Sequence, residues 1–302
     1  MVGWDTFRDF MNSQYRKSTC HRYSYSCEMF KKRMGIQTPD QLRSLTADSV
    51  IGYINEVKAR RKSEGALVDA YAIKAMLEFF DCGDLASKVP APKGFVLSSP
   101  KWLPEPLIHV MVDKYSPNSL MAAIASVGYE LGLRIQEAIQ LDRVAQVGVP
   151  YVDPKTGRAT VRRLKTKQWP WQEHQLGPWA MQHLSFYLAQ RKDRHPALFL
   201  GPRSGKRVDM RTLQHSWAEW MKKTIGLNAD FRLLRHSRLT SMAIDGRDIV
   251  DIARFAGHSS VTPTLIYTHI AGAYRSNPSI VLKELEGSLL YREAQQIIAR
   301  QV

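Results

Sequence analysis

Several side chains suited to anion binding, acid–base or nucleophilic chemistry stand close together in one stretch of the sequence, residues 231–270. It reads FRLLRHSRLTSMAIDGRDIVDIARFAGHSSVTPTLIYTHI. The candidates in this stretch are, in order, Arg232, Arg235, His236, His258 and Tyr267. Tyr267 stands nine residues after His258, which follows a glycine.

Two further groups of candidates stand upstream. Gly132-Leu133-Arg134 places an arginine at an expected helix junction, and Glu137 follows three residues later. Lys165 and Lys167 follow a segment that alternates like a strand. Together they add an arginine, a carboxylate and two lysines to the candidates.

This combination of side chains is suited to cutting a phosphodiester bond without a metal. Arginine donates two parallel hydrogen bonds to a phosphate and keeps its charge. Lysine or histidine can protonate the departing sugar oxygen. Tyrosine can be the nucleophile where surrounding positive charge stabilises its phenolate.

The overall charge of the chain favours a polyanionic partner. The 302 residues include 43 Lys and Arg against 28 Asp and Glu, a formal net charge of +15. An excess of this size is typical of proteins that bind DNA, RNA or an acidic membrane surface. A basic protein that is merely soluble is the alternative.

Several other classes of protein find no support. No apolar run approaches the roughly 18 residues of a membrane span, and MVGWDTFRDF lacks the features of a signal peptide, so we expect a cytoplasmic protein that acts where its DNA is. Cys20, Cys27 and Cys82 do not suggest a disulfide framework. Without a CxxC pair or an HExxH motif, we expect neither a metal nor a cofactor.

A proline-rich segment, residues 88–106, divides the chain. Proline removes a backbone donor and disfavours helix in the residue before it, so we expect an extended, exposed linker. The predicted divisions are a helical domain at 1–87, this linker, a larger domain at 107–275, and a tail helix at 276–302.

The first domain should be helical. Apolar residues recur at helical spacing in 18–34, 47–62 and 67–81. The basic run KARRK at 58–62 is typical of a solvated helix end, and contact with DNA is the second interpretation.

The larger domain should be mainly helical around a small antiparallel sheet. Residues 118–131 carry a buried helical face, and 134–141 continue as a second helix. Residues 153–157, DPKTG, form a turn signal, and the following ATVRRLK alternates like a strand. The helical pattern returns from about residue 178.

The order of these elements resembles the tyrosine recombinases, also called the integrase family. The shared elements are G-L-R-x-x-E, a hairpin lysine, L-R-H-S-x-x-T, G-H-S-S and I-Y-T-H, and the resemblance covers roughly residues 103–270. Residues 1–87 are similar to the family's core-binding domain in position and length. The resemblance implies a two-domain clamp around duplex DNA, mainly α with a small antiparallel β-sheet.

The resemblance also implies roles for the residues that match the family's motifs. Arg134 and Arg235 would hold the non-bridging oxygens of the scissile phosphate. Tyr267 would attack the phosphorus and form a 3′-phosphotyrosyl bond, and Lys165 would protonate the leaving 5′ oxygen. The bond energy is kept in the phosphotyrosine, so rejoining through a Holliday junction would need neither ATP nor a metal.

Three further residues would assist. His258 would hydrogen-bond the phosphate or assist proton transfer, and Glu137 would orient neighbouring groups. His236 would have a structural or supporting role. Tyr274 is the nearby competitor for the nucleophile, but it lies outside the motif.

Arg232 departs from the family's pattern. The family usually has histidine three residues before the second arginine, and here that position is Arg232. Arginine donates hydrogen bonds to phosphate but is a poor proton acceptor. If the position must act as a base, activity should suffer; if it needs only positive charge, which we favour, Arg232 is adequate.

The hairpin leaves two assignments open. Lys165 followed by Thr166 matches the family's pattern better than Lys167 does. Trp169 and Trp171 stand where the family often has further basic residues, and they either pack the hairpin against the domain or stack on DNA.

The resemblance implies double-stranded DNA with a specific target site as the partner. It also implies a homo-tetramer on synapsed sites, and accessory DNA-bending proteins are possible further partners. The tail helix at 276–302 either docks in a neighbouring protomer or folds back on its own domain.

Two other functions fit the same residues. The first keeps the chemistry but ends as a type IB topoisomerase or a telomere-resolvase-like strand transferase. The second is a DNA-binding protein with weakened or lost catalysis, an interpretation that Arg232 keeps open.

Overall fold

The computed structural model describes residues 3–60, 63–89, 101–164, 166 and 170–300. The chain divides into two compact units, Met1–Val96 and Leu97–Val302, and each is described by itself. A membrane-spanning helix is absent from these described parts of the chain.

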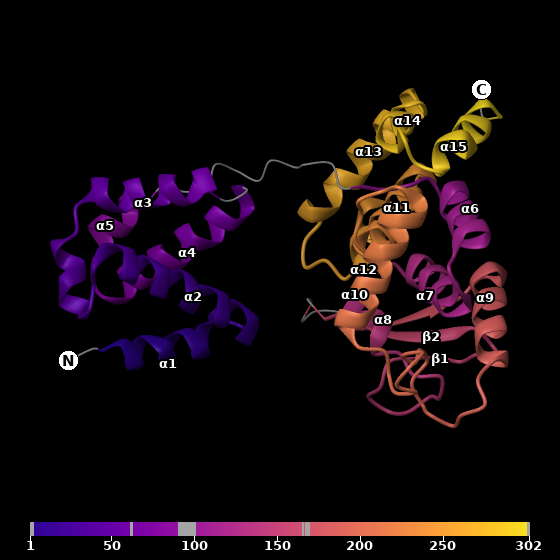
Figure 1. The fold of residues 1–302 in the computed structure, drawn as a ribbon, viewed down its shortest axis with the longest axis horizontal. Helices are drawn as coiled ribbons and strands as arrows, with labels where there is room; N and C mark the ends of the chain where they lie inside the picture. The colour runs from indigo at the N-terminus through magenta and orange to yellow at the C-terminus, as the bar shows by residue number, and fades with distance from the viewer. Residues whose placement is uncertain (1–2, 61–62, 90–100, 165, 167–169, 301–302) are drawn as a thin grey trace. The chain divides into compact units, whose positions relative to one another are not determined.

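The first unit is helical. Its elements are α1 (Trp4–Gln14), α2 (Lys17–Met34), η1 (Pro39–Ser44), α3 (Ala47–Arg60), α4 (Ser63–Phe79) and α5 (Gly83–Lys88). The predicted helices at 18–34, 47–62 and 67–81 correspond to α2, α3 and α4 (Figure 1). They enclose one core, whose least exposed members include Phe30, Ile54 and Ile73.

The described part of the second unit contains twelve further helical segments. They are α6 (Glu105–Tyr115), α7 (Ser119–Glu130), α8 (Ile135–Ile139), α9 (Pro178–Ala189), α10 (Met210–Glu219), η2 (Trp220–Ile225), α11 (Arg232–Ile244), α12 (Ile249–Ala256), η3 (Thr262–Thr264), α13 (Leu265–Ser276), α14 (Ile280–Leu285) and α15 (Leu290–Ala299).

Helix α7 is the centre of this unit. Every residue from 121 to 129 is buried, because α7 packs against both α9 and α11. Small residues let its neighbours come close: a Cβ at Gly128 would lie 2.9 Å from the ring of Phe231, just before α11. The close packing fixes where α11 lies relative to the end of α7.

The predicted small antiparallel sheet is confirmed. Its order is β1 (Tyr151–Val152), β2 (Arg158–Arg162) and β3 (Trp171–Gln175), with both neighbouring pairs antiparallel. The expected turn joins β1 to β2: the Asp153 carboxylate accepts hydrogen bonds from the backbone N–H of Lys155 and the Thr156 hydroxyl, and Gly157 has φ +74°.

The segment before α6 differs from the predicted linker. Residues 90–100 lie outside the described residues, but Leu103 and Pro104, within the predicted linker, are buried rather than exposed. Leu103 is 2% exposed and its backbone N–H donates to the Ser237 hydroxyl at 2.8 Å. Trp102 packs edge-on against Tyr274, and α6 has already begun at Glu105. Pro104 keeps an extended backbone, with ψ 148°, and Pro106 lies in the first turn of α6, where proline is tolerated, so the prolines are compatible with burial of this segment.

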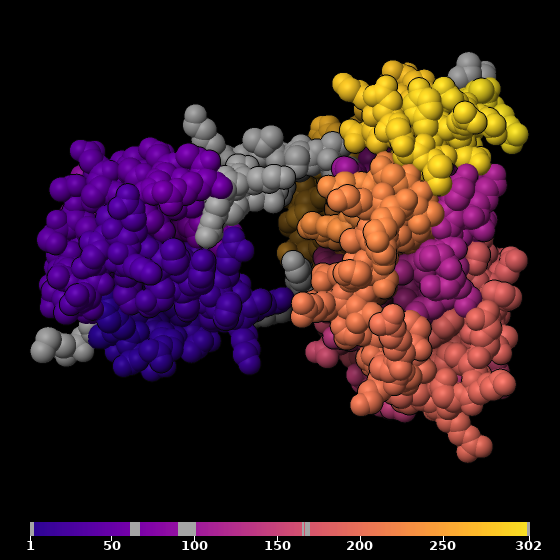
Figure 2. All heavy atoms as spheres, in the orientation of Figure 1, coloured from indigo at the N-terminus to yellow at the C-terminus, as the bar shows by residue number. Residues whose placement is uncertain are grey.

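The tail also differs from the predicted single helix. It forms α14 and α15, and both contribute to the core of their own unit through Leu285, Leu290 and Ala294. Lys114 of α6 pairs with Glu293 of α15 at 2.9 Å. In Figure 2 the yellow residues of the tail lie against the magenta and orange surface of the same unit.

Two adjacent leucines of the tail should respond differently to truncation. Leu290 is fully buried, whereas Leu289 is 51% exposed. We expect Leu290→Ala to lower the free energy of unfolding by about 2–5 kcal/mol, the usual cost of a cavity at a buried leucine. Leu289→Ala should change it by less than about 0.5 kcal/mol. Urea denaturation measures both, and equal effects would contradict the observed packing of α15.

Candidate active site

Arg235 is fixed by backbone carbonyls from two other parts of the chain. It lies in the first turn of α11 and is 4% exposed. One terminal nitrogen donates to the carbonyl of Gly132 at 2.7 Å, and the other donates to the carbonyl of Ala256 at the end of α12. The guanidinium therefore ties the end of α7 to the end of α12.

Arg134 stands where α8 begins. Its guanidinium donates to Glu137 at 2.7 Å, and its backbone N–H donates to the second oxygen of the same carboxylate at 3.0 Å. The side chain of Arg134 is 20% exposed, against 5% for Arg235. Of the two arginines, Arg134 is therefore the more accessible to a ligand.

Glu137 links three arginines. Its side chain is fully buried and accepts hydrogen bonds from Arg134 and Arg163, and Arg235 lies 4.0 Å away. The backbone N–H of Leu164 also donates to it, at 3.3 Å. Burial raises the pKa of this carboxyl, but the three arginines lower it by more, so Glu137 is ionised.

Arg163 belongs to the site but was not among the predicted residues. Its side chain is fully buried one residue after β2, and it donates to Gln172 at 2.8 Å and to the carbonyl of Leu131 at 2.9 Å. The sequence did contain a signal for it. Side chains alternate between the two faces of a strand, so Arg163 is expected on the same face as the inward-facing Ala159 and Val161. An arginine directed inward requires a buried acid, and Glu137 is that acid.

His258 lies between Arg235 and η3. Its Nδ1 is 2.9 Å from the hydroxyl of the buried Thr264, and its Nε2 is 3.4 Å from Arg235. Burial, followed by the charges of Arg235 and Arg134, lowers the pKa of the imidazole to about 3. His258 is therefore neutral in the structure.

Tyr267 is buried, and its hydroxyl contacts a histidine. Its ring is 4% exposed and packs in a small cluster that includes Leu239 and Ile252. Its hydroxyl lies 2.9 Å from Nδ1 of His236. Burial raises the pKa of this phenol, while the charges of Arg235 and Arg134 act to lower it. The competitor Tyr274 belongs to the main core.

Arg232 is placed differently from the other candidates. Its side chain is 70% exposed at the start of α11, and its guanidinium donates to the Asp230 carboxylate at 2.7 Å. Its charge still reaches His236, where it contributes to a lowered pKa.

The hairpin is described only in part. Lys165, Lys167 and Trp169 lie outside the described residues. Trp171 is 40% exposed, and the guanidinium of Arg162 lies 5.7 Å from the centre of its ring. Trp171 is thus on the surface of the sheet rather than in the core.

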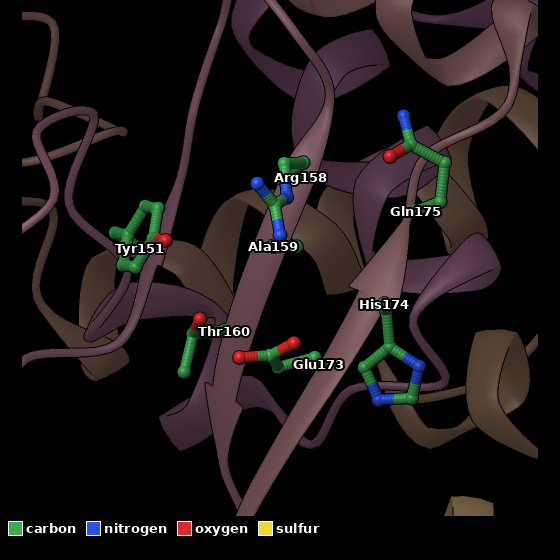
Figure 3. Close-up of a pocket in the computed structure, with 7 residues that line it drawn as sticks. All are labelled: Tyr151, Arg158, Ala159, Thr160, Glu173, His174 and Gln175. Carbon is green, nitrogen blue, oxygen red and sulfur yellow. The ribbon is translucent and has the colours of Figure 1, made fainter.

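A hollow of about 260 Å³ lies against the sheet. Tyr151, Thr160 and Glu173 are cross-strand neighbours beside it (Figure 3). His174 also lines it and lies 3.5 Å from Arg163, so this histidine adjoins both the hollow and the arginine cluster.

The structure therefore gathers half of the predicted site residues at one buried carboxylate. Those brought together are Arg134, Glu137, Arg235 and His258. Tyr267 and His236 form an adjoining pair, within reach of the charges of Arg235 and Arg134. The arrangement thus places two arginines, held by Glu137 and by backbone carbonyls, close enough to Tyr267 for their charges to act on its hydroxyl.

Comparison with known proteins gives the family. The model of the phage integrase family matches residues 107–273, more than half of the chain. The chain belongs to the phage integrase family, whose members are tyrosine recombinases.

Curated relatives include tyrosine recombinase XerC of Escherichia coli O157:H7, 28% identical over 233 residues, which are 71% of this chain and 73% of the relative. XerC of Salmonella typhi is 29% identical over 233 residues, with the same coverage.

Solved structures share the fold at low identity. A lambda integrase dimer bound to a COC′ core site has a TM-score of 0.67 at 13% identity, over 87% of this chain and 75% of that one. A lambda integrase tetramer bound to a Holliday junction has a TM-score of 0.68 at 13% identity, over 89% and 76%.

The stability of the site should depend on pH through Glu137. Its lowered pKa in the folded state means that its stabilisation is fully present above the unfolded pKa of about 4.3 and is lost as the pH falls through the folded value. We expect Glu137→Gln to lower the free energy of unfolding by about 3–5 kcal/mol at neutral pH, because it leaves buried arginines without their counter-charge.

The difference in the free energy of unfolding between wild type and Glu137→Gln should become smaller below pH 4. Denaturation at a series of pH values measures this difference. Glu219→Gln is the matched control, since Glu219 pairs with Lys223 on the surface. A deficit that is independent of pH would show that the charge of Glu137 is not what stabilises the site.

Gly257 should not tolerate a side chain. It has φ +64°, and a Cβ there would lie 2.8 Å from Cγ of Arg163. Gly246 has φ +78° but nothing within 4 Å of the equivalent position. Backbone strain costs about 1–3 kcal/mol at either glycine, so Gly257→Ala should destabilise the protein by more than Gly246→Ala. Thermal unfolding compares the two, and a larger loss for Gly246→Ala would refute the close contact with Arg163.

Proposed function

We propose that this protein is a site-specific DNA recombinase that cuts and rejoins strands through a 3′-phosphotyrosyl intermediate. The observation that carries the proposal is the position of Tyr267, whose phenol lies in the fields of Arg235 and Arg134. Membership of the phage integrase family supports it.

Arg134 and Arg235 bind the scissile phosphate in this proposal. Both are paired with Glu137, which fixes their positions without neutralising them, because one carboxylate is shared among three guanidinium groups. Two arginines held in this way stabilise the charge on the non-bridging oxygens, which grows in the transition state.

Tyr267 supplies the nucleophile. Its oxygen bonds to phosphorus as the bond from phosphorus to the 5′ oxygen breaks, and Lys165 gives the leaving oxygen a proton. One phosphodiester replaces another, so rejoining to a second strand requires no ATP. His258, neutral and held by Thr264, hydrogen-bonds the phosphate.

Arg232 supplies positive charge in this scheme rather than a base. It lies on the surface and is paired with Asp230, which leaves it able to donate to a phosphate but not to accept a proton.

The partner is duplex DNA with a specific site. The net charge of +15 supports binding to a polyanion, and the lambda integrase structures with core-site DNA and with a Holliday junction share this fold. The first unit acts as the core-binding domain, and the two units clamp the duplex. Strand exchange proceeds through a Holliday junction in a homo-tetramer on synapsed sites, with DNA-bending proteins as accessory partners.

The decisive experiment is to trap the covalent intermediate. Wild-type protein is incubated with duplex DNA from its source replicon and flanks, and adducts that survive SDS are collected. We expect a 3′-linked adduct with wild type and none with Tyr267→Phe, since the variant lacks the attacking oxygen. Sequencing the trapped DNA gives the site.

Tyr274→Phe is the matched control for this experiment. Tyr274 is a buried tyrosine of the same helix, and its variant should still form the adduct. An adduct of undiminished yield from Tyr267→Phe would exclude Tyr267 as the nucleophile.

A further inference from the structure

His236 and Tyr267 face each other across two packed helices. His236 follows Arg235 in α11, and Tyr267 stands near the start of α13, which packs along α11. The imidazole Nδ1 and the phenol oxygen are 2.9 Å apart, with ring centres 5.9 Å apart and planes inclined by 34°. The contact joins the attacking atom to a side chain that can accept a proton.

The contact is between neutral partners. Burial, then the charges of Arg232 and Arg235, lower the pKa of His236 to about 4, although Asp230 acts in the opposite direction. Burial raises the pKa of Tyr267, which therefore keeps its proton. A neutral imidazole with its proton on Nε2 presents Nδ1 as an acceptor, and the phenol is then the donor.

The other basic side chains near the site are engaged elsewhere. His258 directs Nδ1 to Thr264 and Nε2 toward Arg235. Arg232 is paired with Asp230 on the surface and has no lone pair to receive a proton. Neither contacts the phenol oxygen in the way that His236 does.

We propose that His236 is a catalytic residue, the base that takes the proton from Tyr267 during cleavage and returns it during rejoining. The proposal rests on the recombinase function proposed above. As the phenol oxygen bonds to phosphorus, its proton moves to Nδ1 of His236, and the bond from phosphorus to the 5′ oxygen breaks. The leaving oxygen takes its own proton from Lys165, so each proton is accounted for and no redox partner is needed.

The bound phosphate makes His236 a better base. In the structure, burial and, after it, the charges of Arg232 and Arg235 disfavour the protonated imidazole. A scissile phosphate between Arg134 and Arg235 brings negative charge to the same place and offsets that field. The proton affinity of His236 therefore rises when DNA is in position, which is when the proton must be accepted.

The test is the rate of single-turnover cleavage, measured on the DNA recovered from the wild-type adduct. His236→Asn keeps a polar atom near the position of Nδ1 but does not accept a proton. We expect cleavage by this variant to be about 100-fold to 1,000-fold slower, within the range for loss of a general base, with unchanged affinity for DNA. His269→Gln is the matched control, an exposed histidine on the helix of Tyr267, and should cleave at the wild-type rate.

A second measurement separates proton transfer from structural damage. Trifluorotyrosine is incorporated at position 267, since fluorine lowers the pKa of the phenol and reduces its need for a base. We expect the fluorinated tyrosine to raise the cleavage rate of His236→Asn by at least about tenfold and to change the wild-type rate little. A substrate with sulfur in place of the bridging 5′ oxygen removes the need for the proton from Lys165, and it should not rescue His236→Asn.

Three outcomes would overturn the proposal. His236→Asn could cleave at the wild-type rate, or it could stay equally slow with the fluorinated tyrosine, which would mean that His236 only supports the fold. If wild type itself forms no adduct, the recombinase function fails and this proposal fails with it. A wild-type adduct combined with either of the first two outcomes removes the role of His236 alone.

Discussion

The candidate site depends on one buried negative charge. Glu137 is enclosed by Arg134, Arg163 and Arg235, which come from three separate segments of the chain. Each guanidinium would be costly to bury alone, and the shared carboxylate together with backbone carbonyls offsets that cost. Because one carboxylate is shared among three guanidinium groups, the cluster keeps a net positive charge, which favours binding of an anion.

The rest of the second unit can be understood as support for this cluster. Helix α7 ends at the carbonyls that receive Arg163 and Arg235, and its close packing with α11 fixes the distance between them. The sheet brings Arg163 in from the other side and holds it through Gln172. Gly257 lets the backbone after α12 pass against the stem of Arg163.

Sequence alone could predict the catalytic unit well because its signals are local. Helical periodicity, the turn at Asp153–Gly157 and the ordered motifs around Arg134, Arg235 and Tyr267 each depend on neighbouring residues. The role of Arg163 was not predicted because it depends on an ion pair with Glu137, 26 residues away. The sequence around Arg163 does not by itself distinguish a buried, paired arginine from one on the surface. The packed residues after the linker and the division of the tail into two helices also depend on distant contacts.

The position of Tyr267 in a separate apolar cluster has a mechanical consequence. Its ring packs with residues of α11, α12 and α13 in a group of six buried side chains, distinct from the large core around α7. In the reaction proposed above, a phenol that is 4% exposed must shift to meet a phosphate, and a small cluster can rearrange at a lower cost than the main core. The fold thus shelters Tyr267, the nucleophile of the proposed reaction, in a small cluster that includes Ala256. Because the carbonyl of Ala256 also holds Arg235, a shift of this cluster would be transmitted to that arginine.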